Sequence, residues 1–421
     1  MPTVLFVACG AVFTFKGKFF QLRRFGESLT LAKNMIKSSK KNKGKGITSF
    51  QSASTALSAT VGTGNIAGVA GAISLGGPGA VFWMWVTSFL GMAIKFCEIE
   101  LAVKHRIKTD GGYIGGPMLY IKSNSKNSMK ILSVLFSLAL IVTSFCTGNI
   151  TQANAVSSLF CDKKAIQIFL GAVLSILTFT VLCGGNKRIG LVSEKVTPIM
   201  SLLYIMLCLV IILINYRKIP YVISKIFIGA FSPESVTSGA ISGIIPVIFS
   251  GSSRGIFSHE AGLGTSAMAH SEAVDADLSK EGLFGVFEVF ADTGIICTLT
   301  ALTILTSGVK IEYGKLSSTL LVNSAFESRF GGLSFVLLSL MMILFAFSSI
   351  IGWASFGNSA VKFMMGEKGK KWYLAVYSLL PMVGALCNVS FAFSSALLFN
   401  GIILIINLFS LLLLREEIIF D

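Results

Sequence analysis

Apolar runs long enough to cross a lipid bilayer recur along almost the whole chain. About 20 helical residues span the ~30 Å hydrocarbon core of a membrane. Hydrophobic residues make up 53% of the sequence and charged residues 13%, which excludes an ordinary soluble domain. The sequence therefore predicts an all-α polytopic membrane protein with about 11 transmembrane helices, over residues 2–15, 54–76, 79–103, 131–160, 165–183, 197–215, 240–270, 282–308, 333–362, 371–388 and 391–414.

The net charge of +15 lies mostly in the short loops between these runs. Loops on one side of the predicted membrane hold roughly three times as many Lys and Arg as loops on the other side, which is typical of cytoplasmic loops. We therefore expect the amino terminus outside and the carboxyl terminus inside. The basic stretch around residues 33–46 is expected to lie at anionic lipid headgroups, and a nucleic-acid partner is not expected.

Two of the predicted spans contain residues that disrupt a helix at mid-membrane depth. The first is "VGTGN" at 61–65, and the second is "GSSRGIFSHEAGLG" at 251–264. Non-helical backbone is tolerated in a membrane only where it is buried in protein or lines a cavity. Because the two spans run in opposite directions and lie five spans apart, they predict a five-plus-five inverted repeat with two discontinuous helices.

Three segments follow from this plan: a short first span with a basic loop (1–50), a first repeat (51–230) and a second repeat (231–421).

Paired broken spans mark the central site of secondary transporters. Their exposed N–H groups suit a substrate carboxylate, and their exposed carbonyls suit a cation. Packing alone accounts for Gly68 and Gly71, whereas Gly62, Thr63, Gly64 and Asn65 together favour an unwound binding segment.

Several sequence blocks carry a resemblance to a known family. They are "TALSATVGTGNIAGVAGAISLGGPGAVFWMWVTSFLGMAIKFCEIELA" (55–102), "GGPMLYI" (115–121), "TQAN" (151–154), "SRGIFSHEAGLGTSAMAH" (253–270) and "FSSIIGW" (347–353). Over roughly residues 10–410 the chain resembles the alanine or glycine:cation symporter family. This resemblance implies the leucine-transporter fold and Na⁺-driven uptake of a small neutral amino acid. It also implies a multi-pass protein of the cell membrane, expected in a bacterial or archaeal inner membrane.

The resemblance also implies roles for single residues. The N–H groups around Thr63, Gly64 and Asn65 would take the substrate carboxylate, with Gln152 holding its amino or carboxylate group. Phe257 and Trp353 would wall the cavity. The expected substrate-binding set is Gly62, Thr63, Gly64, Asn65, Gln152, Phe257, Ser349 and Trp353. The expected partners are alanine or glycine and the lipid bilayer, with no obligate protein partner.

The resemblance implies sodium as the co-transported ion, and hydroxyls and free carbonyls are the hard oxygen ligands that this ion prefers. The resemblance implies hydroxyls of Ser348 and Ser349 and carbonyls of Ser58, Val61 and Phe345. In the alternative interpretation, both serines only bond back to the preceding helical turn. The family usually has Thr where this chain has Ser349.

Charged residues inside the spans leave other interpretations open. Arg254 is expected to pair with Glu260 or Glu98, and His259 to have a polar packing role. Glu288 and Asp292 form a proton relay, pair with Arg254 or Lys95, or satisfy the backbone of the broken helix. Because of the first possibility, a proton-coupled amino acid transporter of the same fold is the alternative function. A membrane enzyme would need a nucleophile–base pair or a metal cluster, and a channel would need a ring of like charges. The sequence offers none of these features, which disfavours both functions.

Overall fold

Helices account for most of the described chain, which comprises residues 2–38, 46–109, 112–123, 127–160, 163–315 and 319–420 of a computed structural model. The helices are α1 (Pro2–Lys16), α2 (Phe20–Arg23), α3 (Phe25–Ser38), α4 (Ser49–Thr60), α5 (Val69–Gly76), α6 (Gly79–Lys104), α7 (Pro117–Ser123), α8 (Asn127–Phe145), α9 (Thr151–Ser157), α10 (Lys164–Leu182), α11 (Gly185–Ile214), α12 (Ile219–Phe231), α13 (Glu234–Thr237), α14 (Ile244–His259), α15 (Thr265–Ser271), α16 (Leu278–Val289), α17 (Thr298–Ser307), α18 (Thr319–Phe330), α19 (Ser334–Leu386) and α20 (Val389–Leu413).

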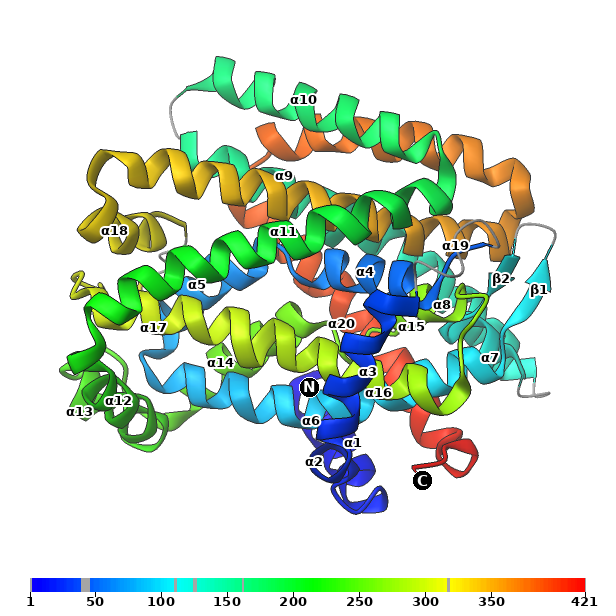
Figure 1. The fold of residues 1–421 in the computed structure, drawn as a ribbon, viewed down its shortest axis with the longest axis horizontal. Helices are drawn as coiled ribbons and strands as arrows, with labels where there is room; N and C mark the ends of the chain where they lie inside the picture. Colours follow the sequence, from blue (N-terminus) through cyan, green and yellow to red (C-terminus); the bar gives the residue numbers. More distant parts are fainter. Residues whose placement is uncertain are drawn as a thin grey trace.

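The long helices lie side by side along the longest axis of the molecule (Figure 1). A short antiparallel hairpin, β1 (Ile107–Thr109) and β2 (Gly112–Ile114), lies at one end together with α7, whereas α12, α13 and α18 lie at the other. We call these the inner and the outer end, following the orientation expected from the charged loops. The hairpin was not expected from the sequence.

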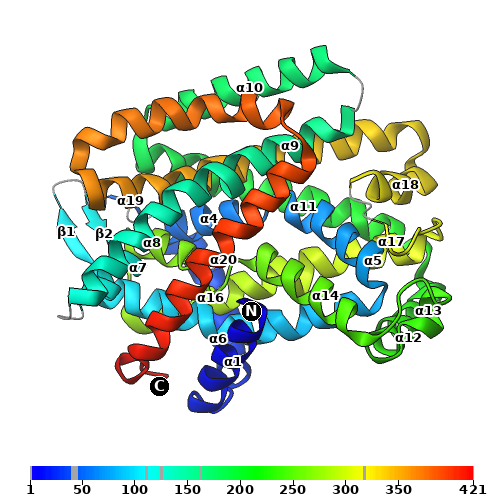
Figure 2. The same cartoon turned by 180° about the vertical axis from the view of Figure 1, so that it is seen from behind.

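Among the described residues, seven helices are long and apolar enough to cross a membrane, or eight if the bent pair α4 and α5 counts as one span. The 53 residues of α19 form two arms, because Gly366 interrupts it with φ 63° and ψ −160°. The arms run in opposite directions, visible from both sides (Figures 1 and 2). These findings confirm an all-α polytopic membrane protein, while the count of 11 helices stays a prediction.

Both predicted breaks exist, and the broken spans run in opposite directions. The axis bends by 45° between α4 and the helical segment that follows it. The chain from α4 to α5 runs toward the outer end, and the chain from α14 to α15 runs away from it (Figure 1). This antiparallel arrangement is the one that an inverted repeat requires.

The second break is shorter than predicted. Backbone with positive φ begins at Glu260 (53°) and includes Gly262 (90°) and Gly264 (75°). The expectation of unwinding from residue 251 is wrong, since α14 stays helical through His259. A side chain at Gly251 would come within 2.2 Å of the Ala80 carbonyl oxygen. The small residues of α14 therefore let it pack closely on α6.

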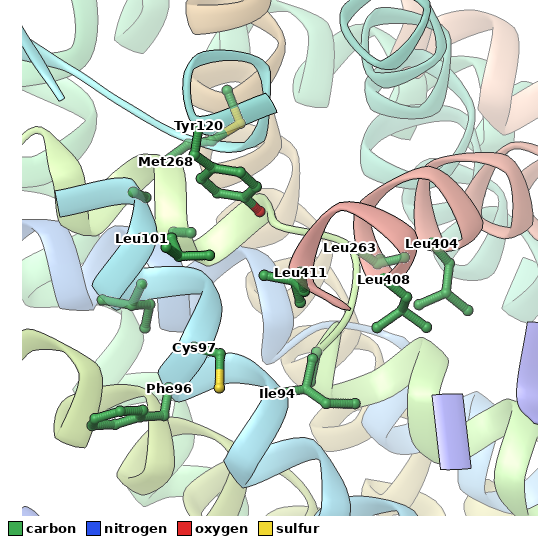
Figure 3. Close-up of a cluster of buried hydrophobic side chains, with 14 of the residues drawn as sticks. Ile94, Phe96, Cys97, Leu101, Tyr120, Leu263, Met268, Leu404, Leu408 and Leu411 are labelled. Carbon is green, nitrogen blue, oxygen red and sulfur yellow. The ribbon is translucent and has the colours of Figure 1, made fainter. Parts of the chain in front are cut away.

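A buried apolar core joins the inner half of the bundle. Figure 3 shows Ile94, Cys97 and Leu101 of α6 near Leu263 of the second break and Leu408 of α20. Helix α1 adds to this core and runs beside the carboxyl-terminal part of α20. Its Cys9 sulfur lies 4.0 Å from the Leu408 carbonyl oxygen, and its Lys16 nitrogen lies 3.1 Å from Glu416. The core therefore holds the second break against α6 and α20.

Candidate substrate and cation site

Two amide side chains replace the helical hydrogen bonds at the first break. The Gly62 amide donates to Asn65 Oδ1 at 2.9 Å, and the Thr63 amide donates to Gln152 Oε1 at 3.2 Å. The Thr63 hydroxyl also donates to the same Gln152 oxygen, at 2.8 Å. The side chain of Gln152 thus lies directly against the unwound segment, beside the residues with which the family resemblance groups it. Its oxygen accepts a hydrogen bond from the amide that was expected to bind a substrate carboxylate.

The rearranged amides leave backbone carbonyls without their helical donors. In an α-helix the Ser58 carbonyl would accept from the amide of Gly62, and the Val61 carbonyl from the amide of Asn65. The Gly62 amide instead bonds to a side chain, and the Asn65 amide bonds to the Gly62 carbonyl at 3.1 Å. Both carbonyls named as cation ligands are therefore released from the helical pattern.

Ser349 of α19 faces this break directly. A side chain at Gly62 would come within 2.3 Å of the Ser349 hydroxyl oxygen, so the two residues are in close contact. The hydroxyl is buried and has no hydrogen-bond partner within the described chain. Since buried hydroxyls are nearly always hydrogen-bonded, this oxygen is an unusual feature that fits a ligand-binding role.

Ser348 behaves differently from its neighbour. Its hydroxyl donates to the Phe345 carbonyl at 3.0 Å, which is the bond to the preceding turn that the alternative interpretation described. Ser58 likewise donates to Thr55 at 2.9 Å and lies 3.2 Å from the Ser193 hydroxyl. Of the hydroxyls considered for sodium, only Ser349 lacks a partner among the described residues.

Gln152 is held in place by the helix that precedes it. Its Nε2 donates to the Thr147 carbonyl at 3.3 Å, and the Thr147 hydroxyl donates to Asn400 Oδ1 at 3.1 Å. Thr147 belongs to a short π-helical segment, Cys146–Ile150. The wider π turn makes this carbonyl available to a side chain five residues later.

Phe257 lies between the first break and a cavity. Its ring would contact a side chain placed at Gly64 at 3.4 Å. On another side it borders a largely apolar cavity of about 580 Å³, which is also lined by Arg254, Leu397 and Asn400. The ring therefore borders both the first break and this cavity, while its role as a wall of the substrate site stays a prediction.

Trp353 is buried behind the break and does not border this cavity in the described structure. Its side chain packs against Gly148, where an added Cβ would lie 2.3 Å from the Trp353 Cβ and 2.4 Å from the ring atom Cγ. The indole nitrogen donates to Glu260 Oε1 at 2.9 Å. Trp353 thus links α19 to the second break.

Asp292 connects the two broken spans through its side chain. One carboxylate oxygen accepts from Asn65 Nδ2 at 2.6 Å, and the other accepts from the Ser258 hydroxyl at 2.8 Å. Asn65 belongs to the first break and Ser258 to the end of α14. Asp292 itself lies in a second π-helical segment, Phe290–Cys297.

A sequence signal for this region does exist. The π-helical segments at 64–68, 146–150 and 290–297 each lie at or beside a Thr-Gly pair, at residues 63–64, 147–148 and 293–294. Single π turns inside helices often occur at functional sites. The repeated pair would have indicated Asp292 as a neighbour of the break.

Of the intramembrane ion pairs considered in the sequence, the described structure contains the one between Lys95 and Glu288 but none with Arg254. The Arg254 guanidinium lies over the Phe393 ring at 5.5 Å, and no ion pair joins it to Glu260 or Glu98 in the described structure. That expectation is wrong because Arg254 lies one and a half turns before the break, whereas Glu98 accepts from the Gly264 amide at 2.9 Å. Lys95 instead pairs with Glu288 at 3.4 Å.

Comparison with known proteins shows to which family this chain belongs. A model described as "Sodium:alanine symporter family" matches residues 1–420. The chain belongs to the sodium:alanine symporter family. It is accordingly a multi-pass membrane transporter and not an enzyme.

Relatives and solved structures agree with this family. The sodium/alanine symporter AgcS of Methanococcus maripaludis is 35% identical over 99% of this chain and 92% of its own length. An uncharacterized transporter of Haemophilus influenzae is also 35% identical, over 99% of this chain and 91% of its own. The crystal structure of MhsT in complex with L-phenylalanine has a TM-score of 0.62 at 14% identity, covering 86% of this chain and 88% of that one. This symporter-family chain therefore has the leucine-transporter fold.

Proposed function

We propose that this secondary transporter carries a small neutral amino acid, alanine or glycine, into the cell together with Na⁺ by alternating access. The observation that carries the proposal is the unpartnered Ser349 hydroxyl opposite a break whose carbonyls have lost their helical donors. A site that consists of neutral oxygens, without a buried carboxylate, is best suited to a hard monovalent cation.

The cation would be held by oxygens of α4 and α19. The carbonyls of Ser58 and Val61 would supply one side, and the hydroxyls of Ser348 and Ser349 with the Phe345 carbonyl the other. Sodium would then draw α19 and the first break together and order the neighbouring amides for the substrate. The membrane potential would add about 2.3 kcal/mol per charge for each 100 mV.

The substrate carboxylate would take the place of the Gln152 oxygen at the Thr63 amide. An amide oxygen and a carboxylate oxygen accept the same hydrogen bonds, so the exchange preserves the partners of the break. Gln152 would turn toward the substrate. Gly62, Gly64 and Asn65 would complete the pocket, with Phe257 and Trp353 limiting the size of the side chain. One extra methylene in such a pocket is worth about 1–3 kcal/mol, so exclusion of larger substrates depends on volume.

Uptake of radiolabelled alanine into proteoliposomes tests this function. An inward Na⁺ gradient without a pH gradient should drive accumulation, and glycine should compete for it. Serine and D-alanine as competitors would define the substrate range. If a pH gradient alone drives uptake and Na⁺ has no effect, the coupling ion is the proton and this proposal is wrong.

A further inference from the structure

A chain of four buried ionisable side chains lies beside the second broken span and is not used by the proposed transport site. His270 of α15 bridges two glutamates of α16: Nδ1 lies 2.6 Å from Glu281 Oε2, and Nε2 lies 2.7 Å from Glu288 Oε1. Glu288 continues to Lys95 of α6 at 3.4 Å. All four side chains are at most 1% exposed.

Hydrogen-bond stoichiometry fixes how many protons this arrangement holds. Each of the two short histidine–glutamate contacts needs one hydrogen, so two protons are shared among His270, Glu281 and Glu288. An imidazolium between two carboxylates and a neutral imidazole with one protonated glutamate both meet this requirement. Either way the three groups carry a net charge of −1, which Lys95 neutralises. A neutral buried cluster with complete hydrogen bonds is stable, whereas loss of one proton leaves a buried charge and breaks one contact.

The inner solution is close to this cluster. Glu281 follows the exposed Lys280, which pairs with Asp277 at 2.8 Å. The segment between α15 and α16 is at the inner end of the described chain (Figure 1), and Lys280 and Glu281 lie in the first turn of α16, directly after it. Protons therefore have a short route from the expected cytoplasmic side to Glu281.

Lys95 links the cluster to the surroundings of the two breaks. Besides its ion pair, Lys95 donates to the His259 carbonyl at 3.0 Å, at the last residue before the second break. Its charge also acts on Glu98, Glu260 and Asp292. Because one cation serves all of these acids, the proton content of the His270 cluster changes the charge balance around both breaks.

Other charged groups on the surrounding elements have partners of their own. Helix α4, which packs on α15, contains no charged residue. Charged groups on or next to α3, α6, α15 and α19 have other partners: Glu27 with Arg24, Glu98 with the Gly264 amide, Glu100 with the Ile419 amide, Lys104 with Glu417, Arg106 with the Ala273 carbonyl, Glu272 with Asn186 and Ser359, and Lys362 with Glu367. Lys33 of α3 is exposed. Among the described side chains, Lys95 is therefore the cation that has an ion pair with the cluster.

We propose that Glu281, His270 and Glu288 form a proton-binding site that makes transport depend on cytoplasmic pH. Deprotonation draws Lys95 toward Glu288 and loosens α15, so transport falls as pH rises. The proton is not required as the driving ion, and the proposal rests on the proposed function only for its transport measurement.

Infrared spectroscopy tests proton binding without transport. The purified protein should show a carboxyl band that titrates above about pH 6.5, the ordinary histidine value, because the two glutamates favour the protonated cluster. Glu281→Gln should reduce that band to the part that other buried carboxyls such as Glu272 contribute. His105→Gln should keep the full band, because His105 pairs with Glu417 at 2.9 Å in a separate, partly exposed position. An unchanged band in Glu281→Gln overturns the proposal.

Transport measurements test the expected dependence of uptake on pH. With a fixed Na⁺ gradient and equal pH on both sides, wild-type uptake should fall at least about tenfold over the same range, the factor for a lost charged hydrogen bond of about 1.5 kcal/mol. His270→Gln should flatten this profile, while His105→Gln should retain it. A wild-type profile in His270→Gln contradicts the proposal. Absence of any Na⁺-driven uptake in the wild type would instead contradict the proposed function. The infrared result would then decide whether the proton-binding site exists.

Discussion

The Asp275 side chain accepts hydrogen bonds from both the amide of Ser49, at 2.7 Å, and its hydroxyl, at 3.0 Å. Ser49 is the first residue of α4, and Asp275 follows α15. A backbone bond from the Val274 amide to the Ile47 carbonyl, at 2.9 Å, lies beside this contact. The inner ends of the two broken spans are thus joined to each other.

Asp275→Ala should weaken closure of the inner end. A carboxylate at a helix amino terminus contributes about 1–2 kcal/mol, so we expect an inward-open population raised about fivefold or more. The measurement is the labelling rate of a cysteine introduced at Ala53 of α4 by an impermeant maleimide. Asp277→Ala is the matched control, and equal rates in both variants would contradict the role of Asp275.

Ser349→Ala should raise the Na⁺ concentration that gives half-maximal uptake by about tenfold, because the variant loses one cation ligand of ~1.5 kcal/mol. Thermal stability should change little, since this hydroxyl makes no hydrogen bond in the described structure. Ser339→Ala serves as the control: it removes another buried, unpartnered hydroxyl from the same helix. An unaltered Na⁺ dependence in Ser349→Ala would remove this residue from the cation site.

Thr63→Val should raise the KM for alanine about tenfold, because the substrate carboxylate that replaces the Gln152 oxygen would lose the Thr63 hydroxyl as a hydrogen-bond donor. Thr55→Val makes the same change on α4, where the hydroxyl only donates to the Gln51 carbonyl at 2.8 Å. We expect the second variant to transport normally. Kinetics of labelled alanine uptake at saturating Na⁺ distinguish the two, and equal KM values would count against the substrate site.

Gly62→Ala and Gly64→Ala form a steric comparison. The added methyl group at Gly62 would lie 2.3 Å from the Ser349 oxygen, whereas at Gly64 the nearest atoms are those of the Phe257 ring at 3.4 Å. Overpacking of a tight site costs about 1–3 kcal/mol. We therefore expect uptake to be nearly abolished in the first variant and reduced only mildly in the second. The reverse order would place the critical contact elsewhere.

Glu272 should make stability depend on pH. It lies beyond α15, and burial raises its pKa from 4.5 to about 7. Since the folded state binds this proton more tightly than the unfolded state, stability is highest below pH 4.5 and decreases as pH rises toward 7. Glu272→Gln should therefore melt at a higher temperature than the wild type at about pH 8, and at a similar one at about pH 4. Melting curves in detergent at both pH values provide the measurement.

The spans were predictable because apolar length depends on local composition. The first break was also local, since Gly62, Thr63, Gly64 and Asn65 occupy consecutive positions. The second break was misplaced because a glycine that permits close helix packing looks the same in sequence as one that ends a helix. Gly251 is helical, and positive φ starts only at Glu260.

Contacts between distant segments were harder to predict. Gln152 was found through the resemblance, and its bond to Thr63 joins residues 89 positions apart. Nothing local distinguished Ser348 from Ser349, since the difference arises from what each hydroxyl faces. The pairing of Lys95 with Glu288 rather than Arg254 with Glu260 likewise depends on how α6 and α16 pack.

Asp292 has a consequence for any attempt to alter the ion or substrate preference of this protein. One carboxylate is shared by Asn65 and Ser258, so neither pseudosymmetric half has a complete polar interior of its own. The polar interior between the broken spans is accordingly a joint property of both halves. Substitutions at these three positions should be non-additive, and redesign has to treat them as one unit.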